Sequence, residues 1–306
     1  MIRFILRRVL GFIPVFLIIA TLVFFLIRLA PGGPFMEGER HVPPEVLEQI
    51  RESYNLNAPL PQQYAMYMWD LVRGDLGPSM QQPSRTVSQW IVLRAPVSVE
   101  LGFYSLIVAL IIGLSAGIIA SLRPNTLTDY IPMSIAMAGI CMPTFVMGPL
   151  LVLIFALKFQ WLPVSGWDAP AEKILPSITL GTVYAAYIAR LARGGMFEVL
   201  AQDFIRTARA KGLSETRVVL RHALRGGLQP VISFLGPAAA GLLTGSFVVE
   251  KIFIIPGLGK QFVDAAFNRD YTMLMGAVLF YAVLILIFNL IVDVAQAWLD
   301  PRVRYD

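Results

Sequence analysis

The sequence is poor in the residues that build metal centres, disulfide bonds and nucleophilic catalytic sites. It contains one cysteine and two histidines among 306 residues. The single cysteine, Cys141, rules out a disulfide within the chain, and two histidines with one thiol do not complete a zinc site on their own. His41 and His222 also lie in different polar segments, separated by several apolar runs. We therefore expect neither a metal nor another cofactor.

Charged residues are also scarce, and long apolar runs take their place. Charged side chains make up 15% of the chain and hydrophobic ones 57%, whereas soluble domains carry about 25% charged residues. A membrane-crossing helix needs about 17 to 25 mostly apolar residues. Six runs meet this length and predict an all-α polytopic membrane protein, with spans at 9–29, 97–122, 130–157, 174–191, 231–249 and 271–299.

The few charges are distributed unevenly along the chain. Arginines gather at both ends and in the segment 190–225, whereas the segment 31–96 contains more acidic than basic side chains. Basic loops of membrane proteins stay in the cytoplasm, so both termini and the segment 190–225 are expected to be cytoplasmic. This bias also explains the net charge of +5 without a nucleic-acid partner.

The expected external segment, 31–96, is too long for a simple turn. Its apolar spacing predicts two short helices, one around residues 46–54 and one around residues 64–71. The segment is either a small cap that contacts a delivery protein or shields a pore entrance, or a packing lid without a recognition role. The sequence leaves both interpretations open.

Two short motifs suggest enzymes but lack the context that those enzymes need. Residues 113–117 read GLSAG, the pattern of a hydrolase nucleophile, but Ser115 lies inside an apolar run without a nearby base. Residues 257–261 read GLGKQ, which lacks the first glycine and the final hydroxyl of a phosphate-binding loop. We therefore expect a chain that does not hydrolyse ATP.

Glycines and prolines indicate how the predicted spans pack and where they are interrupted. Two glycine pairs have the four-residue spacing that lets membrane helices approach closely, at 113/117 and at 241/245. Three prolines interrupt the third span and free backbone carbonyls, which is tolerated beside a cavity or a neighbouring helix. This helix either lines a pore or is a kinked packing helix.

Ionisable side chains inside a membrane span indicate function by default. Glu100 and Asp293 are two such groups, but both lie toward the ends of their spans. Helix capping and interfacial water also accommodate a carboxylate there, so the functional and the structural interpretation both stay open. The candidate pathway residues are Met142, Pro143, Thr144 and Asp293.

The polar segment between the fourth and fifth spans carries the strongest functional signal. Gly212 ends a helical apolar pattern, and Ser214 can cap a second short helix. A basic amphipathic segment binds anionic lipid, nucleic acid or a groove on another protein. No aromatic interleaving supports nucleic acid, and the glycine corner favours a protein, with lipid contact in addition. The apolar stripe before the corner is Phe197, Leu200, Ala201, Phe204, Ile205 and Ala208.

This segment resembles the coupling loop of ABC-importer permeases, whose pattern is EAA-x3-G-x9-I-x-L-P. With Gly212 in the glycine position, Ala208 matches the second alanine and Leu224 the leucine. The other four positions differ and hold Arg206, Thr207, His222 and Arg225. DFIRTARAKGL and RHAL are similar to the variant of the oligopeptide and dipeptide branch. RLAPGGPF, GDLGPS, IPGLG, NRDY and DPRVRY support that branch, and the whole chain most resembles its OppB-type first permease subunit.

The resemblance implies a type I ABC importer in a bacterial cytoplasmic membrane. Two related permease subunits would form the pathway, two ATPase subunits would bind from the cytoplasm, and an external binding protein would deliver peptide. Closure of the ATPases would push a coupling helix at about residues 207–213, with Gly212 at its corner and Ala208 against the ATPase groove. The implied coupling residues are Arg206, Thr207, Ala208, Arg209, Lys211, Gly212, Leu213 and Leu224.

The expected organisation has two parts. Residues 1–93 form the first membrane helix and the external segment, and residues 94–306 form the transmembrane domain with its coupling loop at 195–230. The same machinery could import dipeptides, nickel chelates, glutathione or oligosaccharides instead of oligopeptides. From a different class, a stand-alone secondary transporter would be favoured by inverted repeats or broken midplane helices, and the sequence shows neither clearly. A membrane enzyme is a third possibility, but the sequence shows no group of residues that would form its catalytic site.

Overall fold

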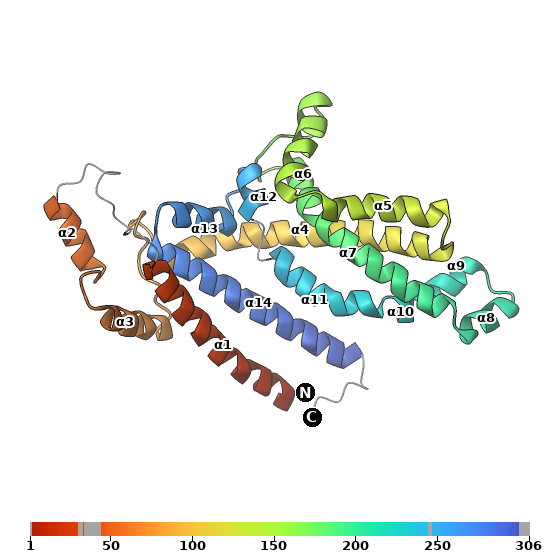
Figure 1. Ribbon diagram of the computed structural model, residues 1–306, viewed down its shortest axis with the longest axis horizontal. Helices are drawn as coiled ribbons and strands as arrows, with labels where there is room; N and C mark the ends of the chain where they lie inside the picture. The colour runs from red at the N-terminus through yellow and green to blue at the C-terminus, as the bar shows by residue number, and fades with distance from the viewer. Residues whose placement is uncertain (1, 30–32, 34–43, 244–246, 300–306) are drawn as a thin grey trace.

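The protein is an elongated array of helices (Figure 1). The computed structural model describes residues 2–29, 33, 44–243 and 247–299. Within these ranges the regular structure is helical, apart from one isolated β-bridge between Pro78 and Thr86. The short helices α2 (Pro44–Ser53) and α3 (Leu60–Val72) lie at one end of the molecule. The segment that follows the fourth predicted span lies at the other end.

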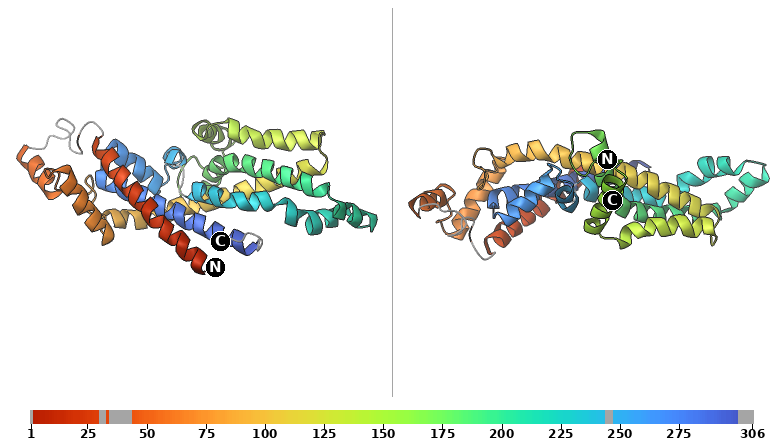
Figure 2. Two further views of the ribbon diagram at one scale, coloured as in Figure 1. Left: turned by 60° about the horizontal axis from the view of Figure 1, so that its bottom comes forward. Right: turned by 90° about the horizontal axis from the view of Figure 1, so that it is seen from above.

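Five helical stretches among the described residues are long and apolar enough to cross a membrane. Their positions match five of the predicted runs, and α1 and α14 pack side by side along the molecule (Figures 1 and 2). The stretches are α1 (Ile2–Leu29), α4 (Val87–Leu122), α7 (Ile174–Leu200), α11 (Gln229–Leu243) continued by α12 (Phe247–Ile252), and α14 (Tyr271–Leu299).

The third predicted span, 130–157, is broken by a sharp bend, and its two halves together are long and apolar enough to form one bent span. The chain forms α5 (Leu127–Cys141) and α6 (Thr144–Leu151), and α6 runs on into a π-helical turn, Val152–Lys158. The two halves are bent by 111°. Pro143 causes the break, because its ring pushes Met142 out of the helical region and supplies no N–H.

Two other helices are longer than their apolar runs suggest. α4 begins at Val87 rather than residue 97 because Thr86 and Gln89 form a capping box, each side chain bonding the other's backbone. α7 continues to Leu200, well past residue 191. The boundary expected between residues 93 and 94 falls inside α4, so it does not coincide with a break in the helix.

The centre of the fold is the contact between α4 and α7, which pack along most of their lengths. Gly113 and Gly117 lie against α7, and a Cβ on Gly113 would come within 2.6 Å of the Ala185 carbonyl oxygen. Only glycine permits this approach. The second predicted pair is described in part: Gly241 faces Tyr184, and Gly245 lies outside the described residues.

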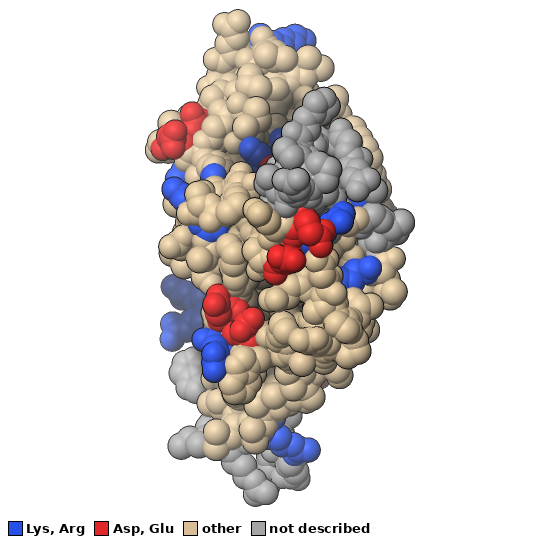
Figure 3. All heavy atoms as spheres, turned by 90° about the vertical axis from the view of Figure 1, so that its left-hand side faces the viewer, with Lys and Arg blue, Asp and Glu red and all other residues tan. Residues whose placement is uncertain are grey.

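The end that carries α2 and α3 is held to the membrane helices by polar contacts. Arg28 at the end of α1 donates to Gln63 of α3, and Thr21 shares a hydrogen bond with Tyr64. Asp270, buried just before α14, accepts from the backbone N–H groups of Met80 and Gln81. The Ser79 hydroxyl also donates to Asp270, so the GDLGPS and NRDY motifs meet around one carboxylate. Seen from this end, most of the surface is uncharged, with acidic and basic groups scattered over it (Figure 3).

We predict that Gly113→Ala lowers the thermal stability of the protein, because the added methyl group overpacks the α4–α7 contact at a cost of about 1–3 kcal/mol. Gly194→Ala on α7 is the matched control, since a Cβ there meets nothing within 4 Å. The control should be neutral or slightly stabilising, because alanine favours helix. Thermal unfolding in detergent, followed by tryptophan fluorescence, compares the two. Equal melting temperatures would contradict the proposed close approach.

Candidate functional site

The candidate site is the segment that follows α7, at the end of the molecule far from α2 and α3 (Figure 1). After α7 the chain forms α8 (Asp203–Ala210), turns at Gly212, and continues through α9 (Glu215–Arg217). A π-helical turn, Val218–Ala223, and α10 (Leu224–Gly227) then lead to α11. Gly212 has φ +78°, a conformation that favours glycine. The observed helix thus ends at Ala210, earlier than the expected 207–213.

The segment folds around its own small apolar core. Ile205 and Ala208 of α8 pack against the π-helical turn and against the end of α7. Ala208 is only 6% exposed, so its methyl group packs inward against this core. Leu213 and Leu224 lie partly buried against this core. Its buried members are Met196, Val199, Ile205, Ala208, Val218, Val219 and Ala223.

The outward surface of the segment combines apolar and basic side chains. Phe204 and Leu220 are 47% and 63% exposed, although the apolar spacing had placed Phe204 in the same stripe as Ile205 and Ala208. The sequence pattern therefore merged two faces of α8, one turned inward and one turned outward. The exposed polar side chains around them are Arg206, Thr207, Arg209, Lys211, Arg217 and Arg221.

Two of these arginines pair with neighbours in the same segment. Arg209 donates to both carboxylate oxygens of Glu215, at 2.8 and 3.2 Å, and so joins α8 to α9 across the glycine corner. Arg206 approaches Asp203 at 3.5 Å. Exposed ion pairs of this kind contribute about 0–1 kcal/mol. They orient the arginines without removing them from the surface.

The four candidate pathway residues do not come together. Met142, Pro143 and Thr144 form the break between α5 and α6. α5 packs on α7 and α4, and α6 packs on α7 and α12. Asp293 lies on α14 and forms an ion pair with Arg8 of α1 at 3.1 Å. That pairing accounts for the carboxylate as a link between the two adjacent helices.

Other ionisable groups in the spans are also paired. Glu100 accepts from Trp167 at 2.9 Å and from Lys173 at 2.6 Å, so its partner is a lysine rather than interfacial water alone.

Asp129 and Glu250 are buried carboxylates that sequence reasoning missed. Asp129, 2% exposed, receives a two-point hydrogen bond from Arg193 at 2.6 and 2.7 Å. Glu250 is fully buried in α12. Each lies one residue outside a predicted span, Asp129 before 130 and Glu250 after 249, so neither was counted as a group inside the membrane.

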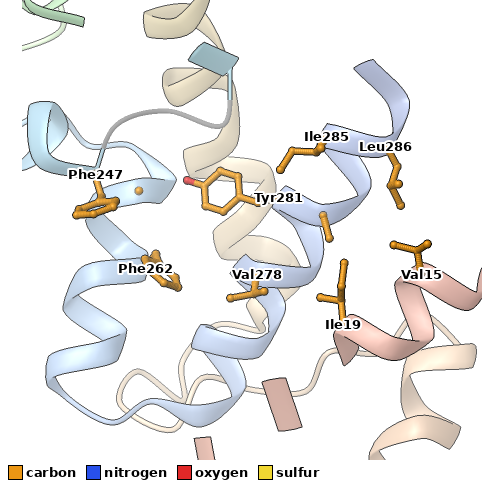
Figure 4. A pocket seen from close by; sticks show the side chains of 10 residues that line it. Val15, Ile19, Phe247, Phe262, Val278, Tyr281, Ile285 and Leu286 are labelled. Carbon is orange, nitrogen blue, oxygen red and sulfur yellow. The ribbon is translucent and has the colours of Figure 1, made fainter. Parts of the chain in front are cut away.

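An apolar cavity of about 520 Å³ lies between α1, α14 and the α12–α13 region, where α13 is Leu258–Phe267 (Figure 4). Val15 and Ile19 line it from α1, and Tyr281 and Ile285 line it from α14. Among the described residues, no charged side chain lines the cavity. It therefore lacks the groups that would fix the charged ends of a peptide, and it is not the candidate site.

Comparison with known proteins gives the family. Residues 103–305 match the binding-protein-dependent transport system inner membrane component, and residues 1–101 match the N-terminal region of such membrane components. The chain belongs to this family of inner-membrane transport components. As a member it is a multi-pass transport subunit rather than an enzyme.

The relatives match along their whole length. The oligopeptide transport system permease protein OppB of Salmonella typhimurium is 49% identical over 100% of both chains. OppB of Escherichia coli K12 is 48% identical over the same extent. The dipeptide transport system permease protein DppB of Bacillus subtilis is 43% identical over 99% of this chain and 98% of its own.

Two solved structures share the fold. The inward-facing MetNI methionine ABC transporter has a TM-score of 0.58 at 15% identity, covering 70% of this chain and 97% of its own. An amino acid ABC transporter has a TM-score of 0.54 at 16% identity, covering 69% and 94%. The all-α, type I ABC-importer permease architecture predicted from the sequence is thereby confirmed.

We predict that Ile205→Ser unfolds the segment locally, whereas Phe204→Ser leaves it folded. Ile205 is fully buried, so its replacement loses about 2–5 kcal/mol of packing, while Phe204 contributes less because it is half exposed. Limited trypsin digestion, which cuts after Lys211 and Arg217, measures the difference. Equal cleavage rates of the two variants would contradict the inward and outward assignment.

Proposed function

We propose that this chain is one of two related permease subunits of an ATP-driven importer for oligopeptides in a bacterial cytoplasmic membrane. Two ATPase subunits bind below it, and an external binding protein delivers the peptide. The observation that carries the proposal is the folded segment 201–227, which presents exposed Phe204 and Leu220 among arginines at one end of the molecule. A helix with an exposed apolar face and a basic rim suits a groove on an acidic partner. The full-length relatives named for oligopeptide transport supply the substrate class.

The segment is built to transmit displacement from the ATPases. α8 is fixed to the end of α7 by the apolar core around Ile205, and α7 is joined to α4 along the glycine contact. A push on α8 therefore moves α7 and α4 together. Coupling of two sites requires such an element with two discrete positions. Gly212 permits the corner, and Arg206, Thr207, Arg209, Lys211, Leu213 and Leu224 flank or support the contact surface.

The orientation follows from the placement of charge. The basic segment 201–227 and the Arg8 end of α1 face the cytoplasm, where positively charged segments remain. α2, α3 and α13 then face outward, and the segment 31–96 serves as the external cap beneath the delivery protein. Arginines beside the membrane, such as Arg221 and Arg225, also meet anionic lipid headgroups.

The pathway passes the break between α5 and α6. A bent membrane helix frees backbone carbonyls, and these are tolerated where they line a cavity. Met142, Pro143 and Thr144 stand at this point, so we assign them to the wall of the route between two permease subunits. Asp293 is assigned to the attachment of α1 instead, because Arg8 occupies its carboxylate.

The broken helix also favours a second candidate, a secondary transporter that works alone, since discontinuous helices are typical of that class. Within the first class, dipeptides, nickel chelates, glutathione or oligosaccharides are the alternative cargoes. Purification of the native complex, with subunits and retained small molecules identified by mass spectrometry, separates these possibilities. We expect a second permease, ATPase subunits and bound peptide. A lone homodimer without ATPase would contradict the proposal.

We predict that Gly212→Val abolishes ATPase attachment and peptide uptake in reconstituted vesicles. The residue is exposed with open space around it, but its φ of +78° disfavours a β-branched side chain. Gly212→Asn is the matched control, because asparagine tolerates this conformation, and it should keep most of the activity. Co-purification of the ATPases and uptake of labelled peptide are measured. Normal uptake by the valine variant would exclude a docking role for the corner.

A further inference from the structure

Two buried carboxylates fix the two ends of the external helix α13. Asp270, after the helix, holds the 79–81 backbone as described above. Glu250, before the helix, has no exposed surface. It belongs neither to the coupling segment nor to the proposed pathway. The IPGLG motif at 255–259 lies directly beside it. The two ends differ in their hydrogen bonds, because Glu250 bonds a side chain of α4, whereas Asp270 bonds the segment before α4.

Glu250 and Ser98 form a short chain of hydrogen bonds between α12, α4 and the start of α13. The Ser98 hydroxyl of α4 donates to one carboxylate oxygen of Glu250 at 2.7 Å. The Leu258 N–H donates to the Ser98 oxygen at 2.8 Å, and the Lys260 N–H donates to the other carboxylate oxygen of Glu250 at 2.8 Å. One acidic side chain thus closes the loop 254–260 against α4.

The glycines of the motif are required by this carboxylate. Gly257 has an extended backbone that any residue adopts, so the backbone conformation does not explain why a glycine occupies this position. A Cβ there would lie 2.7 Å from the Ser98 oxygen, and a Cβ on Gly259 would lie 3.0 Å from both Glu250 oxygens. The motif therefore leaves room for the buried acid to reach the backbone N–H groups.

A strained backbone conformation lies next to the Glu250–Ser98 hydrogen bonds. Ile254, the residue between Phe253 and the motif, has φ +55°. Such a value is a genuine outlier for a β-branched residue and persists only where neighbouring contacts impose it. Its side chain is 60% exposed, so burial of the side chain does not hold it. The Ile255 N–H donates to the Glu250 backbone carbonyl at 2.9 Å, and Phe253 and Ile255 on either side are fully buried, so these contacts hold the turn next to the Glu250 side chain.

We propose that Glu250 is a positioning residue that latches the loop 254–260 onto α4 in one transport state, and that the strain at Ile254 promotes its release in another. The proposal rests on the proposed function. Leu101 of α4, Leu175 of α7 and Val249 of α12 lie in one apolar core, so a displacement of the coupling segment reaches the Ser98–Glu250 bond through this core. A displacement at the cytoplasmic end thereby changes the Ser98–Glu250 contact at the external end.

The test uses a reporter cysteine in the Cys141→Ser background, which removes the chain's single thiol. Leu258→Cys places a buried thiol in the latched loop. A membrane-impermeant maleimide added from outside labels it only after release. Met80→Cys, buried at the Asp270 end, controls for general loosening, and the highly exposed Phe267→Cys controls for reagent access.

In the nucleotide-free complex we expect slow labelling of Leu258→Cys. Adding Glu250→Gln should accelerate it at least tenfold, because the amide replaces one of the two oxygens that accept from the Ser98 hydroxyl and the Lys260 N–H, while labelling at position 80 stays unchanged. Vanadate trapping of the complex with its binding protein should also accelerate labelling at position 258. Ile254→Gly should abolish that acceleration and slow uptake, because glycine relieves the strain that drives release.

The outcomes separate the latch from the proposed function. If labelling at position 258 is the same in nucleotide-free and trapped complexes that import peptide normally, the latch is excluded and the proposed function stands. If no ATPase associates, the proposed function fails, and the Glu250→Gln comparison on the purified chain still tests the latched state. Unchanged labelling in that comparison overturns the latch, and so does equal acceleration at position 80.

Discussion

Membrane helices gain little from hydrophobic association, because lipid tails are as apolar as leucine. α4 and α7 therefore hold together through close van der Waals contact, which Gly113 and Gly117 permit. The other helices of the transmembrane domain are arranged around this pair: α5 and α11 pack on both, and the coupling segment extends from α7. A looser contact would leave the two ends of the molecule free to move separately.

In the proposed mechanism, the contact between α4 and α7 lets the segment 201–227 pass a displacement on to the membrane helices. A short cytoplasmic helix on a flexible tether would absorb a push by bending. Here Ile205 and Ala208 fix α8 to the end of α7, and Arg209 joins α8 to α9 across Gly212. The apolar side chains that face outward are thus mounted on a folded platform. This platform carries the surface at which we propose that force enters the chain.

Composition and apolar run length were enough to predict the fold class and most spans, because a bilayer allows few alternatives. The break at Pro143 was hidden, since hydropathy remains high across a bend. The Thr86–Gln89 capping box marks the start of α4. The predicted start came from the length of the apolar run instead, and it was therefore too late. At the site, Gly212 was predictable from its chemistry. The inward direction of Ala208 was not, because amphipathic spacing does not distinguish a protein's own core from a partner's groove.

The buried Asp129–Arg193 pair has a consequence for the assembly of the fold. The two residues are separated by 64 positions in sequence, and Asp129 lies in the first turn of α5, beside the loop that follows α4. Loss of one partner of a buried pair leaves the other charge without its counterpart, at a cost of about 3–5 kcal/mol. The start of the broken helix is therefore fixed only when the later helix α7 is in place.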